Sequence, residues 1–284
     1  MKIDMEKYER FYNQFEQEEQ EILVVFGNTR GGAGKAGGDL WTASVGFLAY
    51  LDMETNVVRK GDGRIVWPIT DKVLKKKSSS YPYYFKQGIV YRLRVRAFKD
   101  RNVTEGRNPS YYNCFLVVKV LKKRVRCDEL TAIFAEYLKP VVLHDHGMGD
   151  FTLNKNLSVF EGEVEWMGRQ ISVYLDVEKD NEDSWAAALE HLRTLHQQQQ
   201  ERDDRFRRFA ADELTDLAND WLGDEEETEI TNEVFARRIM LMELSVDADG
   251  NYSAYHDDDN MFYGHSVTVT GNVKSGENDV NIEG

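Results

Sequence analysis

The sequence predicts an α+β protein built from two modules, and three observations support this prediction. The chain has 284 residues, enough for two domains that each bury a core. Short segments with strand-like alternation are interspersed with segments of helical spacing. The charge divides unevenly, because residues 1–150 hold 25 Lys and Arg against 19 Asp and Glu, whereas residues 151–284 hold 11 against 31. We therefore predict a basic, β-rich module with a leading helix over residues 1–145 and an acidic α+β domain over residues 150–284.

The first module is predicted to be a small antiparallel barrel or sandwich with flanking helices. Four aromatic residues at helical spacing predict a docked helix over residues 5–20: Tyr8, Phe11, Tyr12 and Phe15. Four apolar or alternating segments predict strands: 22–26, 41–51, 89–97 and 114–121. A helix over residues 128–137 is expected to end the module. The boundary is placed in residues 140–150, where Gly147 and Gly149 interrupt the pattern.

The acidic domain is predicted to be an antiparallel sheet covered by helices. In its first hairpin Phe160, Val164 and Trp166 alternate with glutamates before the turn at Met167-Gly168, and residues 171–177 alternate in the same way. A row of carboxylates should therefore lie on the outer face: Glu161, Glu163 and Glu165, with Asp176 and Glu178 from the neighbouring strand.

Helices and further strands complete the predicted acidic domain. One helix begins near Asp183 and a second extends to about Trp221. Thr231 is the predicted N-cap of a third helix, because Ile230 and Phe235 have the spacing of a hydrophobic staple. Three strands are predicted after it: 240–247, 251–256 and 261–270.

Composition argues against several classes of protein. The apolar fraction is 41% and the charged fraction 30%, which are ordinary values for a globular chain. No run of about 18 apolar residues occurs, so no membrane-spanning helix is expected. The N-terminus lacks the apolar stretch of a secretory signal, and two cysteines, Cys114 and Cys127, are too few for a disulfide scaffold. We expect a cytoplasmic protein with free thiols.

Four short motifs distinguish the acidic domain: Phe151-Thr152-Leu153-Asn154-Lys155, Phe160-Glu161-Gly162, Asn219-Asp220-Trp221-Leu222 and Tyr263-Gly264-His265-Ser266. Through them, residues 150–284 resemble an uncharacterised bacterial family, number twenty-two sixty-two in the domain-of-unknown-function series. The segments Gly37-Gly38-Asp39-Leu40-Trp41-Thr42-Ala43 and Trp67-Pro68-Ile69-Thr70-Asp71 resemble the module often found ahead of that family. The resemblance implies a fold and a bacterial cytosolic setting, and it supplies no catalytic residue.

A glycine-rich segment after the first predicted strand resembles a phosphate-binding P-loop: Arg30-Gly31-Gly32-Ala33-Gly34-Lys35-Ala36. In such a loop, backbone amides and the lysine hold phosphates, and a following Ser or Thr ligates magnesium. Ala36 replaces that hydroxyl residue, and Gly37 and Gly38 stand where a helix should begin. We favour a turn-forming loop. The alternative is a nucleotide-dependent enzyme that uses Arg30, Gly31, Gly32, Gly34 and Lys35.

No metal site or catalytic constellation is predicted. His144-Asp145-His146 lacks further ligands at a standard spacing and is interpreted as part of a surface linker. The segment 247–251 lacks the glycine and glutamate positions of a calcium loop and is interpreted as a hairpin turn. No Ser/His/Asp or Cys/His signature occurs. We therefore expect a protein that is not an enzyme and needs no cofactor or metal.

Basic residues in the first module predict a positive surface, since residues 57–126 hold 19 Lys and Arg against 4 Asp and Glu. Alternation places Arg92, Arg94 and Arg96 on one sheet face. This pattern is typical of grooves that bind single-stranded nucleic acid. Further basic residues and tyrosines lie near it in the sequence: Lys122, Lys123, Arg124, the lysine run 75–77, Tyr81, Tyr83, Tyr84, Tyr111 and Tyr112. An equally weighted interpretation is that the acidic domain of the same chain covers this surface, because a net charge of −14 repels long polyanions.

The leading hypothesis is a non-enzymatic bacterial interaction protein whose carboxylate row binds a basic protein partner, in the manner of an immunity protein that neutralises a toxin. Carboxylates on a stable sheet steer association with basic surfaces. The alternatives are single-stranded nucleic-acid binding through the basic module and nucleotide-dependent catalysis through the glycine-rich segment. No membrane partner is expected.

Overall fold

The computed structural model describes residues 5–27, 31–35, 40–69, 83–102, 112–178, 180–222 and 229–284, apart from the side chains of Met5 and Asp62. The chain divides into two compact units, Met1–Lys139 and Pro140–Gly284. Strands and helices occur in both, which confirms the α+β prediction. Within the described residues, no helix combines the length and the apolar character needed to cross a membrane.

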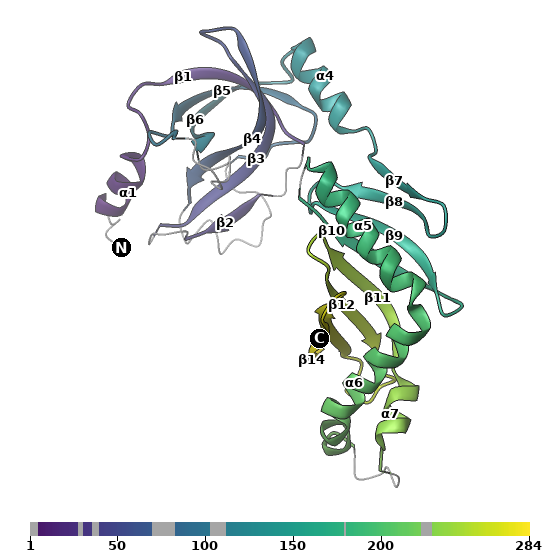
Figure 1. The fold of residues 1–284 in the computed structure, drawn as a ribbon. Helices are drawn as coiled ribbons and strands as arrows, with labels where there is room; N and C mark the ends of the chain where they lie inside the picture. Colours follow the sequence, from purple (N-terminus) through teal and green to yellow (C-terminus); the bar gives the residue numbers. More distant parts are fainter. Residues whose placement is uncertain are drawn as a thin grey trace. The chain divides into compact units, whose positions relative to one another are not determined.

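Five strands of the first unit close into a barrel (Figure 1). They are β1 Gln20–Val25, β3 Thr42–Asp52, β4 Val57–Pro68, β5 Val90–Ala97 and β6 Cys114–Lys123. The pairing order is β1-β5-β6-β4-β3, and β1 also pairs with β3, which completes the circle. The prediction of a small barrel is confirmed, although β4 and β6 are parallel instead of antiparallel.

Alternate residues of the barrel strands fill its interior, among them Ile22, Leu93 and Phe115, which have no exposed surface. An irregularity in the β3–β4 pairing at Leu48 shifts the alternation, so that Tyr50 joins the interior cluster while Leu51 packs outside. Helix α4, Asp128–Tyr137, covers that outer patch. The core is therefore sealed at this side of the barrel.

The leading helix is shorter than predicted. Helix α1 spans Met5–Tyr12, whereas the aromatic spacing predicted a helix over 5–20. Phe15 instead forms a β-bridge with Phe98, and the Glu16 N–H donates to the Ala97 carbonyl. The aromatic residues predicted to lie on one helix are thus divided between helix α1 and the extended segment that follows it.

The second unit is built on one eight-stranded sheet (Figure 1). Its strands are β7 Val142–Asp145, β8 Gly149–Asn154, β9 Val159–Trp166, β10 Arg169–Asp176, β11 Met240–Asp247, β12 Asn251–Asp257, β13 Ser266–Asn272 and β14 Gly276–Glu283. They pair in chain order. The predicted sheet is confirmed with one difference: β10 and β11 are parallel. A parallel pair requires a long crossover, and here the crossover contains the helices of the unit.

Three helices form that crossover: α5 Glu182–Gln197, α6 Gln199–Asp220 and α7 Asn232–Arg238. Figure 1 shows α5 and α6 along one side of the sheet, and their buried side chains join strand residues in a single apolar cluster. The cluster includes Phe160, Phe206 and Leu244, which have no exposed surface. The N-caps are Asn181, two residues before the predicted Asp183, and Thr231, as predicted.

Two segments of this unit differ from the sequence prediction. Residues 140–150, treated as a boundary, instead contain β7 and the turn into β8, which belong to the sheet. Residues 261–264, predicted as strand, form turns before β13 because the buried Asp258 carboxylate accepts the N–H groups of Phe262 and Gly264. Strand β14 was not predicted, since its alternation is mostly polar.

Candidate functional site

The helices leave one side of the eight-stranded sheet without a described helix, and we call this side the open face. Its members follow from the register: residues paired with Glu163 across the sheet are Ser172 in β10, Glu243 in β11 and Tyr255 in β12. The intervening residues, such as Val164 and Leu244, belong to the helix-covered core. Alternation thus separates an apolar side from a polar side across the whole sheet.

The predicted glutamate row lies on the open face. Phe160, Val164 and Trp166 are at most 2% exposed, whereas Glu161, Glu163 and Glu165 are exposed. Gly162 occupies the core position where the apolar pattern is broken. A Cβ there would lie 2.5 Å from a ring carbon of Phe151, so the close packing of that ring requires glycine. The row therefore lies in a register that the core fixes.

The open face carries ten carboxylates from its strands: Asp150, Glu161, Glu163, Glu165, Asp176, Glu243, Asp247, Asp257, Asp279 and Glu283. None of the strand residues on this face is Lys or Arg. Arg169, the only Lys or Arg in these eight strands, pairs with Trp166 and therefore lies on the core side of the sheet. Like charges on one face together produce a negative electrostatic potential over it.

That potential acts on the Tyr174 phenol in the middle of the face. The Glu243 carboxylate, with that of Glu161 and partial burial, raises the pKa of the Tyr174 phenol. Partial burial also raises the pKa of Glu243. Two strands away, Thr268 is 1% exposed, and no described group hydrogen-bonds to its Oγ1. The centre of the face thus holds a buried hydroxyl without a partner among the described residues.

A hollow of about 300 Å³ lies on the open face towards the end of β11. Asp176, Ser245, Ser253 and Thr270 are among the residues that line it. Within it, the Ser245 hydroxyl donates to Asp176 Oδ2 across 2.6 Å. Hydroxyl and carboxylate oxygens are hydrogen-bond acceptors, so the hollow suits a cationic or donor-rich group.

The structure separates the two residues predicted beside the glutamate row. Asp176 lies on the open face in β10, as predicted. Glu178 lies beyond the end of β10 and helps to begin α5: its carboxylate accepts from Asn181 Nδ2, and its carbonyl from Trp185 Nε1. Sequence reasoning assigned Glu178 to the face because it extended the alternation two residues past the strand.

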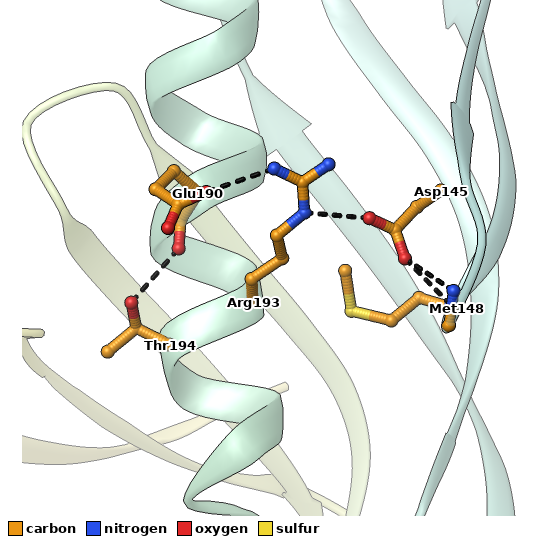
Figure 2. A network of polar contacts seen from close by, with 6 residues as sticks. Asp145, Met148, Glu190, Arg193 and Thr194 are labelled. Atoms are coloured by element: carbon orange, nitrogen blue, oxygen red, sulfur yellow. Dashed lines mark hydrogen bonds and ion pairs between the residues drawn. The ribbon is translucent and has the colours of Figure 1, made fainter.

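On the core side of the same sheet, carboxylates are paired with helix arginines. Asp145 of β7 accepts from Arg193 of α5 (Figure 2), with 2.7 Å between the two atoms. It also accepts from the backbone N–H groups of Gly147 and Met148. Burial raises the pKa of Asp145, but these hydrogen bonds outweigh it and leave the pKa below its ordinary value. The segment predicted as a surface linker is therefore a hairpin tied to α5.

The neighbouring histidines do not assemble a metal site. His144 Nδ1 lies 2.8 Å from Asp150 Oδ1 on the exposed side of the β7–β8 hairpin. Among the described residues, no group of three His, Cys, Asp or Glu side chains could hold a metal ion. The turn at 247–251 is a hairpin turn, with Asp247 Oδ1 accepting the N–H groups of Asp249 and Asn251.

Residues 145–282 match a family described as an uncharacterized protein conserved in bacteria, DUF2262. Residues 7–137 match a second family, the domain of unknown function DUF7021. The chain joins a DUF7021 domain to a DUF2262 domain. The resemblance that the motifs of the acidic half indicated is thereby confirmed. No curated protein and no solved structure matches the chain.

In the DUF7021 domain, the predicted arginine row lies on one face of β5, but its members already have partners within the domain. Arg92 and Arg94 bind Glu21 of β1, with nitrogen-to-oxygen distances of 2.5 and 3.2 Å. Arg96 donates to the backbone carbonyls of Tyr12, Phe15 and Glu16. These arginines hold the leading segment against the barrel instead of forming a free cationic groove.

The other predicted nucleic-acid contacts are distributed differently. Lys122, Lys123 and Arg124 are exposed at the end of β6, and no ion pair joins them to another described residue. Tyr84 is 56% exposed, whereas Tyr83 packs its ring edge-on against Trp67. The lysine run 75–77, with Tyr81 and Tyr111, lies outside the described residues.

The glycine-rich segment forms an edge strand where a phosphate loop was the alternative. Strand β2, Gly32–Gly34, pairs with residues 42–44 of β3. A Cβ on Gly31 would lie 2.8 Å from the Ser44 carbonyl oxygen, so this glycine permits close strand approach. Lys35 Nζ lies 5.3 Å from the centroid of the Trp41 ring. Gly32 and Gly34 are thus committed to a strand, and Arg30 lies outside the described residues.

Sequence reasoning missed Tyr174, Glu243 and the acceptors of the hollow. A signal existed, since residues 240–247 alternate apolar with polar positions, but pairing across β10 and β11 cannot be derived from alternation alone. The parallel register places Glu243 opposite Ser172 and beside Tyr174.

Proposed function

We propose that this chain is a non-enzymatic binding protein of the bacterial cytoplasm, and that the open face of its DUF2262 domain docks on a basic protein surface. The observation that carries the proposal is the charge of the face, which has ten carboxylates and no Lys or Arg among its strand residues. An immunity protein that neutralises a basic toxin would act in this way. Arrays of one charge accelerate encounters with a complementary partner and disfavour partners of the same charge.

The rigidity of the face supports the proposal. Slipping β9 by one residue would bury Glu161, Glu163 and Glu165 and expose Phe160, so the register holds the carboxylates in place. Preorganised charges lose little conformational freedom when a partner binds. The face is therefore suited to binding without rearrangement of the sheet.

The hollow offers a place for one side chain of the partner. A Lys or Arg side chain entering it would meet the Asp176 carboxylate and the hydroxyl oxygens of Ser253 and Thr270. Its volume of about 300 Å³ exceeds the size of a single arginine side chain and leaves room for water.

Affinity capture from native cytosol tests the proposal when it compares two variants of equal charge. One combines Glu161→Gln, Glu163→Gln and Glu165→Gln on the open face. The control combines Asp204→Asn, Glu213→Gln and Asp216→Asn, which are exposed on α6. We expect the wild type and the control to retain one basic protein that the open-face variant loses.

Two results would count against the proposal. One is equal recovery by the wild type and the open-face variant, and the other is equal loss in both variants. If the open-face variant instead increases protease sensitivity near Lys139-Pro140 at low salt, the partner is the basic unit of the same chain.

A further inference from the structure

A second hollow lies in the DUF7021 domain and is independent of the open face. It has a volume of about 650 Å³, within the range of about 300–1,000 Å³ typical of ligand sites. Residues of the β3–β4 hairpin line one side, and Arg101, Tyr112 and Asn113, between β5 and β6, line the other. We call it the barrel-mouth hollow. The sequence pattern pointed to the basic segment 57–126 and to Tyr112, but it singled out none of Arg59, Lys60 and Arg101.

Three cations line this hollow: Arg59 and Lys60 from β4, and Arg101. No ion pair joins any of them to a described carboxylate, in contrast to Arg92 and Arg94. The nearby Asp52 uses its Oδ1 to accept the N–H groups of Glu54 and Thr55 in the hairpin turn. The hollow therefore keeps uncompensated positive charge among the described side chains, an arrangement that attracts anions.

Aromatic groups fix the geometry of the hollow. The Arg101 guanidinium lies over the Phe115 ring, 5.4 Å from its centroid. Tyr50 packs edge-on against Phe115 with centroids 5.0 Å apart, and burial raises the pKa of its phenol, so it stays an uncharged donor at neutral pH. Tyr112 also lines the hollow and is half-buried.

We propose that the barrel-mouth hollow binds a short single strand of nucleic acid. Arg59, Lys60 and Arg101 would contact phosphates, and one base would stack on Tyr112. Cations beside aromatic rings are the combination by which proteins hold single strands without sequence preference. A polyanion without bases would contact these three cations but would not stack on the Tyr112 ring.

The probe is a fluorescein-labelled thymidine oligonucleotide of about 15 nucleotides, with the full chain and fluorescence anisotropy over a salt series. The test variant combines Arg59→Glu and Lys60→Glu. The control combines Lys122→Glu and Lys123→Glu, an equal charge reversal at the opposite end of β6 from Asn113, which lines the hollow. All four residues are exposed, and thermal unfolding verifies that both variants fold.

We expect the wild type to bind and the test variant to bind at least about tenfold more weakly. The slope of its log affinity against log salt concentration should be about 1.4 shallower than that of the wild type, since each lost phosphate contact on a single strand contributes about 0.7. The control should change affinity about twofold at most. Absence of wild-type binding at low salt, or equal loss in both variants, would overturn the proposal.

A second variant distinguishes nucleic acid from other polyanions. Tyr112→Leu should weaken oligonucleotide binding about fivefold or more, because a stacked base is lost, and should leave competition by inorganic polyphosphate unchanged. Equal oligonucleotide binding by wild type and Tyr112→Leu would reject stacking and show a site for polyanions without bases.

Discussion

The arginine row of β5 and the glutamate row of β9 follow the same alternation but have different surroundings. Glu21 and backbone carbonyls satisfy the arginines, which therefore hold the leading segment of the barrel. The glutamates share their face with seven further carboxylates, and no strand residue there is Lys or Arg. Alternation assigns a charge to a face, but only tertiary pairing shows whether that charge is available to a partner.

The same contrast exists within the DUF2262 domain, between the two sides of one sheet. On the core side, Asp145 is paired with Arg193 and Glu277 with Arg205, and beneath the sheet Asp203 of α6 is paired with Arg207. On the open face, the strands themselves supply no Lys or Arg partner for their carboxylates. We infer that the paired carboxylates serve stability and the unpaired ones serve binding, and substitutions can test this division.

The largest expected effect is at Asp203. It is 3% exposed, lies 2.7 Å from Arg207 Nε, and accepts from Trp166 Nε1 across 3.2 Å. Asp203→Ala should lower the free energy of unfolding by about 3 kcal/mol, because it leaves a partly buried arginine and a buried indole N–H unpaired. Urea unfolding measures this change. The exposed neighbour Asp204→Asn is the control, and an equal loss there would contradict the assignment.

A smaller loss is expected at Asp145, whose side chain is 10% exposed. Asp145→Asn should lower the free energy of unfolding by about 1–3 kcal/mol at neutral pH, because Arg193 and two backbone N–H groups lose a charged acceptor. Asp150→Asn, at the exposed pair with His144, should change it by about 0.5 kcal/mol at most.

The pH dependence of the Asp145 effect has a defined sign. The folded pKa of Asp145 lies below its ordinary value, so its contribution is complete above the unfolded pKa of about 3.9 and is lost as pH falls through the folded pKa. The stability curves of wild type and Asp145→Asn should therefore converge in acid. A constant difference between them down to about pH 2 would contradict the pairing.

The smallest stability effect is expected on the open face. Replacing Glu161, Glu163 and Glu165 with Gln removes like-charge repulsion without removing an arginine partner. The free energy of unfolding should stay within about 0.5 kcal/mol of wild type or rise slightly. Thermal unfolding at low and high salt measures this, and a marked loss would mean that these glutamates stabilise the fold.

Much of this fold could be predicted from the sequence, because local alternation determines which residues are buried. Phe160, Val164 and Trp166 indicated their strand, its turn and its exposed glutamates. The helix caps at Thr231 and near Asp183 were likewise local signals. Strand β14 and the β7–β8 hairpin were missed, since edge strands with polar or short sequences carry little apolar periodicity.

The sites were less predictable than the fold. The barrel-mouth hollow is lined by residues of β4 and by residues just before β6. Strands β4 and β6 pair in parallel although a long segment of the chain separates them. The partners of Arg92 and Arg94 lie in β1, more than 70 residues away. Alternation contains no information on such long-range pairings. It therefore predicted a free arginine row and missed Arg59, Lys60 and Arg101, which pair with no carboxylate in the described part of the chain.

The central claim is that the open face steers a basic partner, and association kinetics test it most directly. Once capture has identified the partner, its association and dissociation rates are measured with wild type, the Glu161/Glu163/Glu165→Gln variant and the α6 control across a salt series. The open-face variant should associate more slowly at low salt with little change in dissociation, and the difference should shrink as screening shortens to below about 10 Å. Association rates equal to wild type at every salt concentration, or an equal slowing by the α6 control, would contradict the claim.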